Sequence, residues 1–165
     1  MILPIYIYGN QILRDDCKSI DDTYPDLNKL ISDMFDTMCN ANGIGISAPQ
    51  IGLSIRLFLI DLTPYHNEDP SIPNIKKVFI NPKIISESGL DNTHNEGCLS
   101  IPGIREDINR KSQIKIQYFD EKFNSVCDEI DGMFARVFQH EYDHLNGILF
   151  IDHLSPLKKN IINRK

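Results

Sequence analysis

Two segments of the chain repeat apolar residues with the period of a helix. In residues 25–41 the apolar positions recur every three or four residues, and polar residues fill the positions between them. Residues 131–147 are apolar on nearly every side, start at Asp131-Gly132 and stop at Asn146-Gly147. A helix that is apolar all round is buried all round. The pattern therefore predicts an N-terminal amphipathic helix and a second helix buried in the centre of the fold.

Shorter apolar runs between these helices predict strands. The runs lie at residues 53–61, 77–86, 112–120 and 124–130, and the last two form a plausible hairpin. Three prolines within residues 63–75 predict a surface loop, and residues 1–20 predict an irregular, partly extended arm. This order of elements predicts an α+β fold in which antiparallel or mixed strands pack around the central helix.

Length and charge narrow the classes of function. The chain has 165 residues, which is enough for a single domain, 1–165, to bury its own core without disulfides. A formal net charge of −6 argues against nucleic acid or an anionic membrane as the main partner. No apolar run approaches the roughly 20 residues of a membrane span, and the first residues lack a basic leader. We therefore expect a cytoplasmic protein with reduced cysteines at positions 17, 39, 98 and 127.

The buried helix contains His-Glu-x-x-His, with His140 and His144 four residues apart. On a helix this spacing places both imidazoles on one face, one turn apart, where they can bind one divalent metal. Glu141 stands beside the first imidazole, within reach of a water that the metal activates. The alternative is a buried helix that carries two histidines without a metal. Buried polar side chains need partners, however, and a metal would supply one.

A catalytic divalent metal usually has three protein ligands, so a third donor is required. The extended motif His-Glu-x-x-His-x-x-Gly-x-x-His fails because Phe150 stands at its last position. His153 and His94 are alternatives on spacing alone. Cys98, in Glu96-Gly97-Cys98-Leu99-Ser100, offers a thiolate that binds borderline-soft metals well, although a cysteine taken alone is more often a small buried hydrophobe.

A glycine-containing stretch, Gly43-Ile44-Gly45-Ile46-Ser47-Ala48-Pro49-Gln50, follows the first predicted helix. It lacks the Gly-Lys-Ser/Thr of a phosphate loop, and Pro49 removes an amide donor, so the pattern gives little support to nucleotide binding. Glycines here are better explained by the close approach of a ligand backbone. Gln50 would contribute a neutral side chain that both donates and accepts hydrogen bonds.

In this order, residues 43–50, 96–100 and 139–147 resemble the three signature motifs of bacterial-type peptide deformylases. The second motif matches throughout, and the third matches as Gln-His-Glu-x-Asp-His-Leu-x-Gly. The first departs at one position, where Ser47 replaces the usual alanine. This substitution is small and leaves Gln50 in place. The spacing of the motifs also fits, so the resemblance covers essentially the whole chain.

The resemblance implies a metal-dependent hydrolase that removes the N-formyl group from the N-terminal formyl-methionine of nascent polypeptides and releases formate. It implies that Cys98, His140 and His144 hold the metal. Ligand chemistry alone would favour zinc. Enzymes of this kind typically use Fe²⁺, however, so the resemblance favours Fe²⁺, with Zn²⁺, Ni²⁺ or Co²⁺ as alternatives.

Further roles follow from the same resemblance. Glu141 is the expected general base, while the Gln50 side chain and the Leu99 backbone N–H are expected to stabilise the oxyanion. The residues expected to contact the substrate are Ile44, Gly45, Gly97, Arg105 and Val137. Of these, Val137 belongs to the methionine pocket, and Arg105 has the alternative of being a solvated surface arginine. Glu96 and Asp143 are expected to orient the ligands, with Arg110 as the partner of Glu96.

Two rival classes remain open on the sequence. A metallopeptidase would cut internal amide bonds in peptides without a formyl group. A structural-metal protein would need a fourth protein ligand, from His94 or His153, and would have no use for Glu141. The basic tail, residues 155–165, predicts a short helix. Because nascent substrates emerge from the ribosome, we hypothesise that its positive charges dock weakly there; they are Lys158, Lys159, Arg164 and Lys165.

Overall fold

The computed structural model describes residues 1–165 as an α+β structure organised around one sheet of five strands. The strands are hydrogen-bonded in sequence order, β1-β2-β3-β4-β5, and every neighbouring pair is antiparallel. Their bounds are Gly45–Ser47 for β1, Leu57–Asp61 for β2, Lys76–Cys98 for β3, Ile101–Phe119 for β4 and Ser125–Asp131 for β5. The predicted α+β class is confirmed, and the sheet is antiparallel rather than mixed.

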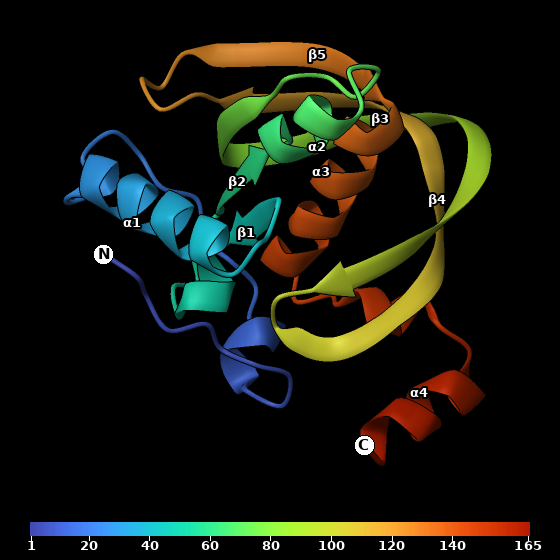
Figure 1. Cartoon of the computed structure of the whole chain (residues 1–165). Helices are drawn as coiled ribbons and strands as arrows, with labels where there is room; N and C mark the ends of the chain where they lie inside the picture. The colour runs from blue at the N-terminus through green and yellow to red at the C-terminus, as the bar shows by residue number, and fades with distance from the viewer.

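The long strands β3 and β4 form a curved ribbon around helix α3, Gly132–Leu145 (Figure 1). The pairing register of these two strands shifts at several points, and such bulges increase the local bend and twist of a strand. The ring of Phe138 on α3 meets those of Phe58 and Phe79 edge-on, with centroid distances of 5.0 and 5.2 Å. Each such pair adds about 0.5–1.5 kcal/mol beyond the burial of apolar area. These contacts hold α3 against β2 and β3.

Helix α1, Leu27–Asn40, lies within residues 25–41, where an amphipathic helix was predicted. Its apolar face buries Met34 and Met38 in a cluster that also contains Ile46 and Leu59 from β1 and β2. Residues that precede α1 are mostly irregular, as predicted, apart from the 3₁₀ turn η1 at Gln11–Arg14.

Two predictions for the middle of the chain are corrected. The predicted loop at residues 63–75 opens with helix α2, Thr63–Glu68, because Pro64 falls in the first turn, where a missing N–H breaks no helical hydrogen bond. Residues 87–111, which were not predicted as strands, fall almost entirely within β3 and β4. Many of them are exposed, so pairing between the two strands defines them rather than an alternating apolar pattern.

The tail forms helix α4, Pro156–Asn163, which confirms the short helix predicted there. The Ser155 hydroxyl accepts a hydrogen bond from the backbone N–H of Lys158 at the start of this helix. Ile162 is buried in a third apolar cluster with Leu13 and with Phe150, which lies in the 3₁₀ turn η3, Phe150–His153. No helix in the chain has the length and apolar character required to cross a membrane.

Candidate metal-dependent active site

Helix α3 and the end of β3 bring together the three residues predicted to bind a metal. His140 and His144 lie one turn apart on α3, with ring centroids 5.2 Å apart, and Cys98 is the last residue of β3. One donor atom from each residue lies within 4.8 Å of the others. The alternative third ligands lie outside this cluster: His94 is exposed, and His153 Nε2 is hydrogen-bonded to Asp143 Oδ2 at 2.8 Å.

The chemistry of these donors fits a divalent cation. Cys98 Sγ and His144 Nε2 face each other at 3.3 Å, while Nδ1 of His144 is buried without a hydrogen-bond partner. Burial, and secondarily His140, lower the pKa of His144, so its imidazole stays neutral and keeps a lone pair. A cysteine sulfur and a neutral imidazole nitrogen that face each other at this distance can both bind one cation. The residues present therefore suit a borderline-soft metal.

Glu96 fixes the orientation of His140. Its Oε1 atom lies 2.9 Å from His140 Nδ1, so an Nδ1–H bond to the carboxylate leaves Nε2 free as the ligand atom. The carboxylate also accepts two hydrogen bonds from Arg110, at 2.7 and 3.0 Å, which confirms the predicted pair. Burial raises the pKa of Glu96, but hydrogen bonds from His140 and Arg110 outweigh it and hold the pKa well below its usual range. Glu96 is therefore a permanent anion behind His140.

Two further charged residues complete this buried network. Arg136, on α3, donates to Glu96 Oε2 at 2.7 Å and to the backbone oxygen of Ile108 at 2.8 Å. Asp143 accepts from Arg110 Nη1 at 2.8 Å. Arg136 was not predicted as part of the site, although an arginine inside a helix that is otherwise apolar on nearly all sides indicates a buried ionic partner.

Glu141, the predicted general base, lies next to the donor cluster and lines the cavity beside it. Its side chain comes from α3 beside His140, only 4% of the residue is exposed, and its Oε2 atom is buried without a hydrogen-bond partner. Burial raises the pKa of Glu141 to about 7, although nearby His140 opposes that rise. Glycine at position 45 leaves room for the Glu141 carboxylate, because a Cβ there would force that carboxylate to move. A carboxylate of this kind can take up and release a proton near neutral pH.

Gln50 lies next to Cys98, in the 3₁₀ turn η2, Ala48–Ile51. Its Oε1 atom accepts a hydrogen bond from the backbone N–H of Ser47 at 2.9 Å, as in half of a capping box. Its Nε2 atom donates to Ser100 Oγ at 3.1 Å and lies 3.6 Å from Cys98 Sγ. The amide N–H end of Gln50 therefore faces the cluster of metal-binding donors.

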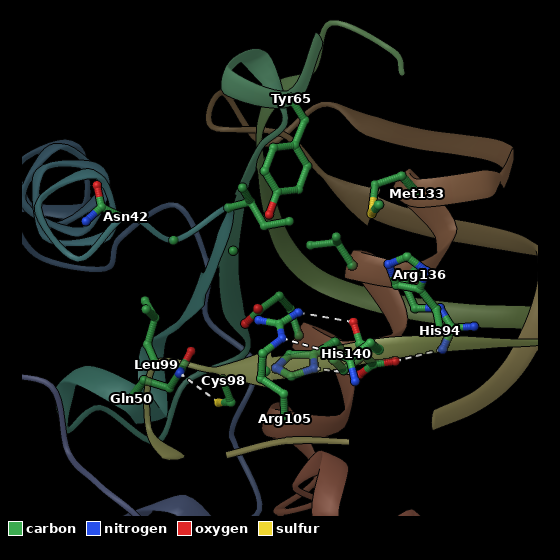
Figure 2. A pocket seen from close by; sticks show the side chains of 18 residues that line it. Asn42, Gln50, Tyr65, His94, Cys98, Leu99, Arg105, Met133, Arg136 and His140 are labelled. Atoms are coloured by element: carbon green, nitrogen blue, oxygen red, sulfur yellow. Dashed lines mark hydrogen bonds and ion pairs between the residues drawn. The ribbon is translucent and has the colours of Figure 1, made fainter. Parts of the chain in front are cut away.

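The remaining predicted residues line one cavity of about 240 Å³ beside this cluster (Figure 2). Arg105 lies across Gly97, and its Nε donates to Asn95 Oδ1 at 2.8 Å, so this guanidinium is held at the rim of the cavity. Tyr65 and Met133 also line the cavity and were not predicted as site residues; Tyr65 lies in α2, a segment that was predicted to be a loop. The predicted residues on the cavity wall are Ile44, Gly45, Gln50, Gly97, Cys98, Leu99, Arg105, Val137, His140 and Glu141.

These features together define the class of protein. A Cys-His-His donor cluster opens onto a cavity that also presents a buried carboxylate and an amide donor. Such a set is typical of a metal-dependent hydrolase that attacks an amide-like carbonyl.

Residues 2–160 match the family described as Polypeptide deformylase. The chain is similar to the peptide deformylase of Christiangramia forsetii, with 48% identity over 172 residues, covering 100% of this chain and 88% of that protein. It is also similar to the crystal structure of a peptide deformylase from Legionella pneumophila, with 37% identity and a TM-score of 0.87, covering 100% of this chain and 93% of that one. A peptide deformylase from Ehrlichia chaffeensis, solved in complex with actinonin, has a TM-score of 0.90 at 32% identity, covering 99% of this chain and 94% of that one.

The chain belongs to the polypeptide deformylase family. Its reaction is the hydrolytic removal of the N-formyl group from the N-terminal formyl-methionine of newly synthesised proteins, with release of formate.

Proposed function

We propose that Cys98, His140 and His144 hold one divalent metal, that Glu141 is the general base and acid, and that Gln50 and Leu99 stabilise the oxyanion. The observation that carries this assignment is the Glu141 carboxylate, which is buried and unpartnered on the wall of the cavity beside the donor cluster. A buried carboxylate without a partner is costly unless a ligand or a reaction uses it.

The chemistry that the metal supplies when bound is Lewis acidity, which polarises the formyl carbonyl and makes water a stronger acid. The Glu141 carboxylate accepts a proton from the attacking water as the water oxygen bonds to the formyl carbon. The carbonyl electron pair moves onto the oxygen, where the Gln50 Nε2–H and the Leu99 backbone N–H donate hydrogen bonds to it. The C–N bond then breaks, Glu141 passes its proton to the leaving amine, and the products are formate and a free amino terminus.

The peptide is proposed to bind as an added strand beside Ile44, Gly45 and Gly97. Support comes from β1, which is the last strand at one edge of the sheet and so has an unpaired side for another backbone. The methionine side chain would enter the apolar part of the cavity at Val137, which Met133 extends. Arg105 would stand near the polar backbone of the bound peptide, because Asn95 holds its guanidinium at the cavity rim.

Four further assignments belong to this proposal. The working metal is Fe²⁺, with Zn²⁺, Ni²⁺ or Co²⁺ as the alternatives. Residues 1–165 form one catalytic domain that works in the cytoplasm. The basic tail, residues 155–165, docks weakly on the ribosome. Support for docking is limited to its charges and to the exposure of Leu157 and Ile161 on α4.

The decisive experiment measures formate release from a formyl-Met-Ala-Ser peptide by metal-loaded wild-type protein and by Glu141→Gln. Glutamine keeps the shape of glutamate but cannot take a proton, so kcat should fall by roughly 10²–10⁴-fold while metal content stays unchanged. A peptide with a blocked N-terminus and no formyl group should not be cut. Near-normal turnover by metal-loaded Glu141→Gln would remove Glu141 from its role, and cleavage of the blocked peptide would favour a metallopeptidase.

A further inference from the structure

Both the oxygen and the nitrogen of the Gln50 side-chain amide are hydrogen-bonded to neighbouring serines. Besides the backbone N–H of Ser47, the Ser47 hydroxyl donates to Gln50 Oε1 at 3.1 Å. The other end of the amide donates to Ser100 Oγ. Ser47 and Ser100 are fully buried and Gln50 is 1% exposed, so water does not compete for these hydrogen bonds.

The Ser47 backbone N–H and the Ser47 hydroxyl, which both donate to Oε1, determine the orientation of the Gln50 amide. The oxygen and nitrogen ends of a glutamine amide have nearly the same shape, so packing alone does not distinguish them. If the amide flipped, Oε1 would point at Cys98 Sγ, and the site would lose the N–H that faces the reacting carbonyl. The flipped amide would also set its NH₂ group against the Ser47 N–H, and the Ser47 hydroxyl would have to turn its proton away. Ser47 therefore favours the orientation in which Nε2 faces the cavity.

The N-terminal arm ties the two segments that carry this amide and its acceptor. The backbone N–H of Tyr6 donates to the Gln50 carbonyl at 2.8 Å, and that of Tyr8 donates to the Ser100 carbonyl at 2.8 Å. The Tyr6 ring packs on Gly52, where a Cβ would collide with it. Two alternate amides of one segment thus connect η2 to the turn between β3 and β4.

We propose that the Ser47 hydroxyl, supported by the arm amides of Tyr6 and Tyr8, is a positioning brace that fixes the Gln50 amide for oxyanion stabilisation. This rests on the proposed role of Gln50. Ser47 is fully buried and does not line the cavity, so we expect it to act on the reaction through Gln50. Its loss should therefore slow the chemical step without weakening the binding of the unreacted peptide.

The first measurement compares Ser47→Ala with Ser54→Ala, a serine whose hydroxyl bonds to Asp15 away from the cavity. Ser47→Ala removes one oxygen atom, so the fold should persist. We expect kcat to fall roughly fivefold, the order that one neutral hydrogen bond contributes, with KM unchanged. Binding of the non-formylated peptide Met-Ala-Ser, which has no formyl carbonyl, should be the same as in wild type. Ser54→Ala should keep wild-type kcat. An unchanged kcat in Ser47→Ala, or a rise in KM that accounts for the whole effect, would overturn the brace.

A double-mutant cycle with Gln50→Leu separates this inference from the proposed function. Loss of one oxyanion donor should lower kcat by roughly 10²–10³-fold. If Gln50→Leu keeps full activity, Gln50 does not stabilise the oxyanion, and both the proposed role of Gln50 and the positioning role of Ser47 are wrong. If Gln50→Leu is slow, Ser47→Ala should cause no further loss in that background. The same fivefold loss in both backgrounds would show that Ser47 acts elsewhere and would overturn the brace alone.

The arm is tested by removing one backbone N–H with proline. Tyr8→Pro deletes the N–H that donates to Ser100 and also the hydroxyl that donates to Asn163, so Tyr8→Ala, which loses the same side chain and keeps the N–H, is measured beside it and should keep wild-type kcat. Ile7→Pro is the control for a proline in the arm, because Ile7 is 57% exposed and its N–H makes no hydrogen bond to the backbone. We expect Tyr8→Pro to lower kcat with KM unchanged and Ile7→Pro to leave both constants at wild-type values. Equal effects of the two prolines would reject the arm as part of the brace, and the Ser47→Ala cycle decides the hydroxyl even if Tyr8→Pro does not fold.

Discussion

Glu141 packs its carboxylate directly against the Cα atom of Gly45, on the strand at the edge of the sheet. This contact joins the first and third motifs: one supplies a position without a side chain, and the other supplies the carboxylate that fills the space. Gly45 does not have a positive φ, so its conformation is open to any residue. Glycine is needed here for space and not for backbone freedom.

Gly45→Ala should therefore fold and bind metal but turn over slowly, because the added methyl group displaces the Glu141 carboxylate. A displacement on the order of 1 Å costs roughly 10²-fold in rate. The measurement is kcat for a formyl-Met peptide, with metal content determined on the same sample. The double variant Gly45→Ala/Glu141→Asp, whose carboxylate is one methylene shorter, should recover part of the loss. Wild-type turnover in Gly45→Ala would contradict the contact as a determinant of activity.

Cys98→Ala should lose metal affinity, while alanine at any of the other three cysteines should not. Only Cys98 has its sulfur in the donor cluster; Cys39 and Cys127 are exposed, and Cys17 is buried in an apolar cluster. The measurement is metal content after dialysis against a chelator, with Co²⁺ loading to detect the absorption of a thiolate–metal bond. Full metal content in Cys98→Ala would rule out the three-ligand site.

Glu96→Gln should destabilise the metal-free protein at neutral pH and less so in acid. Because the folded-state pKa of Glu96 is depressed, its ionised form contributes stability above the unfolded pKa of about 4.3, and this contribution is lost as pH falls toward the folded pKa. Breaking a buried pair costs about 3–5 kcal/mol, since Arg136 loses its carboxylate partner and Arg110 is left with Asp143. Urea unfolding at pH 7, 5, 4 and 3 gives the gap between variant and wild type at each pH.

That gap should shrink steadily below about pH 4.3. The control is Glu129→Gln, on the exposed face of β5, which should show no comparable gap at any pH. A gap that stays constant from pH 7 to pH 3 would mean that Glu96 stabilises the fold by its shape and not by its charge.

The parts of this site that could be predicted are those in which the residue type itself carries the chemistry. His140, Glu141 and His144 follow from helical spacing, and their burial follows from an apolar pattern around the helix. Cys98 could not be chosen over His94 or His153 by spacing, because the contact between β3 and α3 spans 46 residues of sequence; the resemblance to a known family decided it.

The missed features have physical reasons. Residues 87–111 are mostly polar and lack an alternating apolar pattern, and their strands are defined by pairing with each other. Arg136 is set in an apolar helix, and its partner Glu96 lies 40 residues away. Ser47 was read as a neutral replacement for alanine, whereas its hydroxyl donates to Gln50. Hydrogen bonds between distant segments are fixed by the fold and leave little trace in sequence.

Charge reversal on α4 should weaken co-sedimentation with ribosomes if the tail docks there. Truncating the chain after Leu154 would not isolate the charges, because it also removes Ile162 from an apolar cluster. Lys158 is left unchanged because it is paired with Glu106 at 3.0 Å. The better variant changes Lys159, Arg164 and Lys165 to Glu. Changing three exposed lysines elsewhere to Glu is the control for net charge; they are Lys83, Lys115 and Lys122. Equal co-sedimentation of both variants at low salt would dismiss the tail as the docking element.

The last prediction concerns the metal. Two imidazoles and a thiolate are suitable ligands for zinc. Such sites generally bind Zn²⁺ more tightly than Fe²⁺, so affinity alone would favour zinc. Activity is a separate property, and the resemblance to ferrous deformylases favours Fe²⁺ as the working ion. Cys98 is only partly buried and lines the cavity, so oxygen can reach the thiolate and inactivate an iron form. We therefore expect the Fe²⁺ protein to be the more active one and to lose activity in air.

The test is to strip the metal, reload separate samples with Fe²⁺, Zn²⁺ and Ni²⁺ without oxygen, and compare kcat on one formyl-Met peptide before and after exposure to air. A zinc form that equals or exceeds the iron form, and is stable in air, would overturn the assignment of iron.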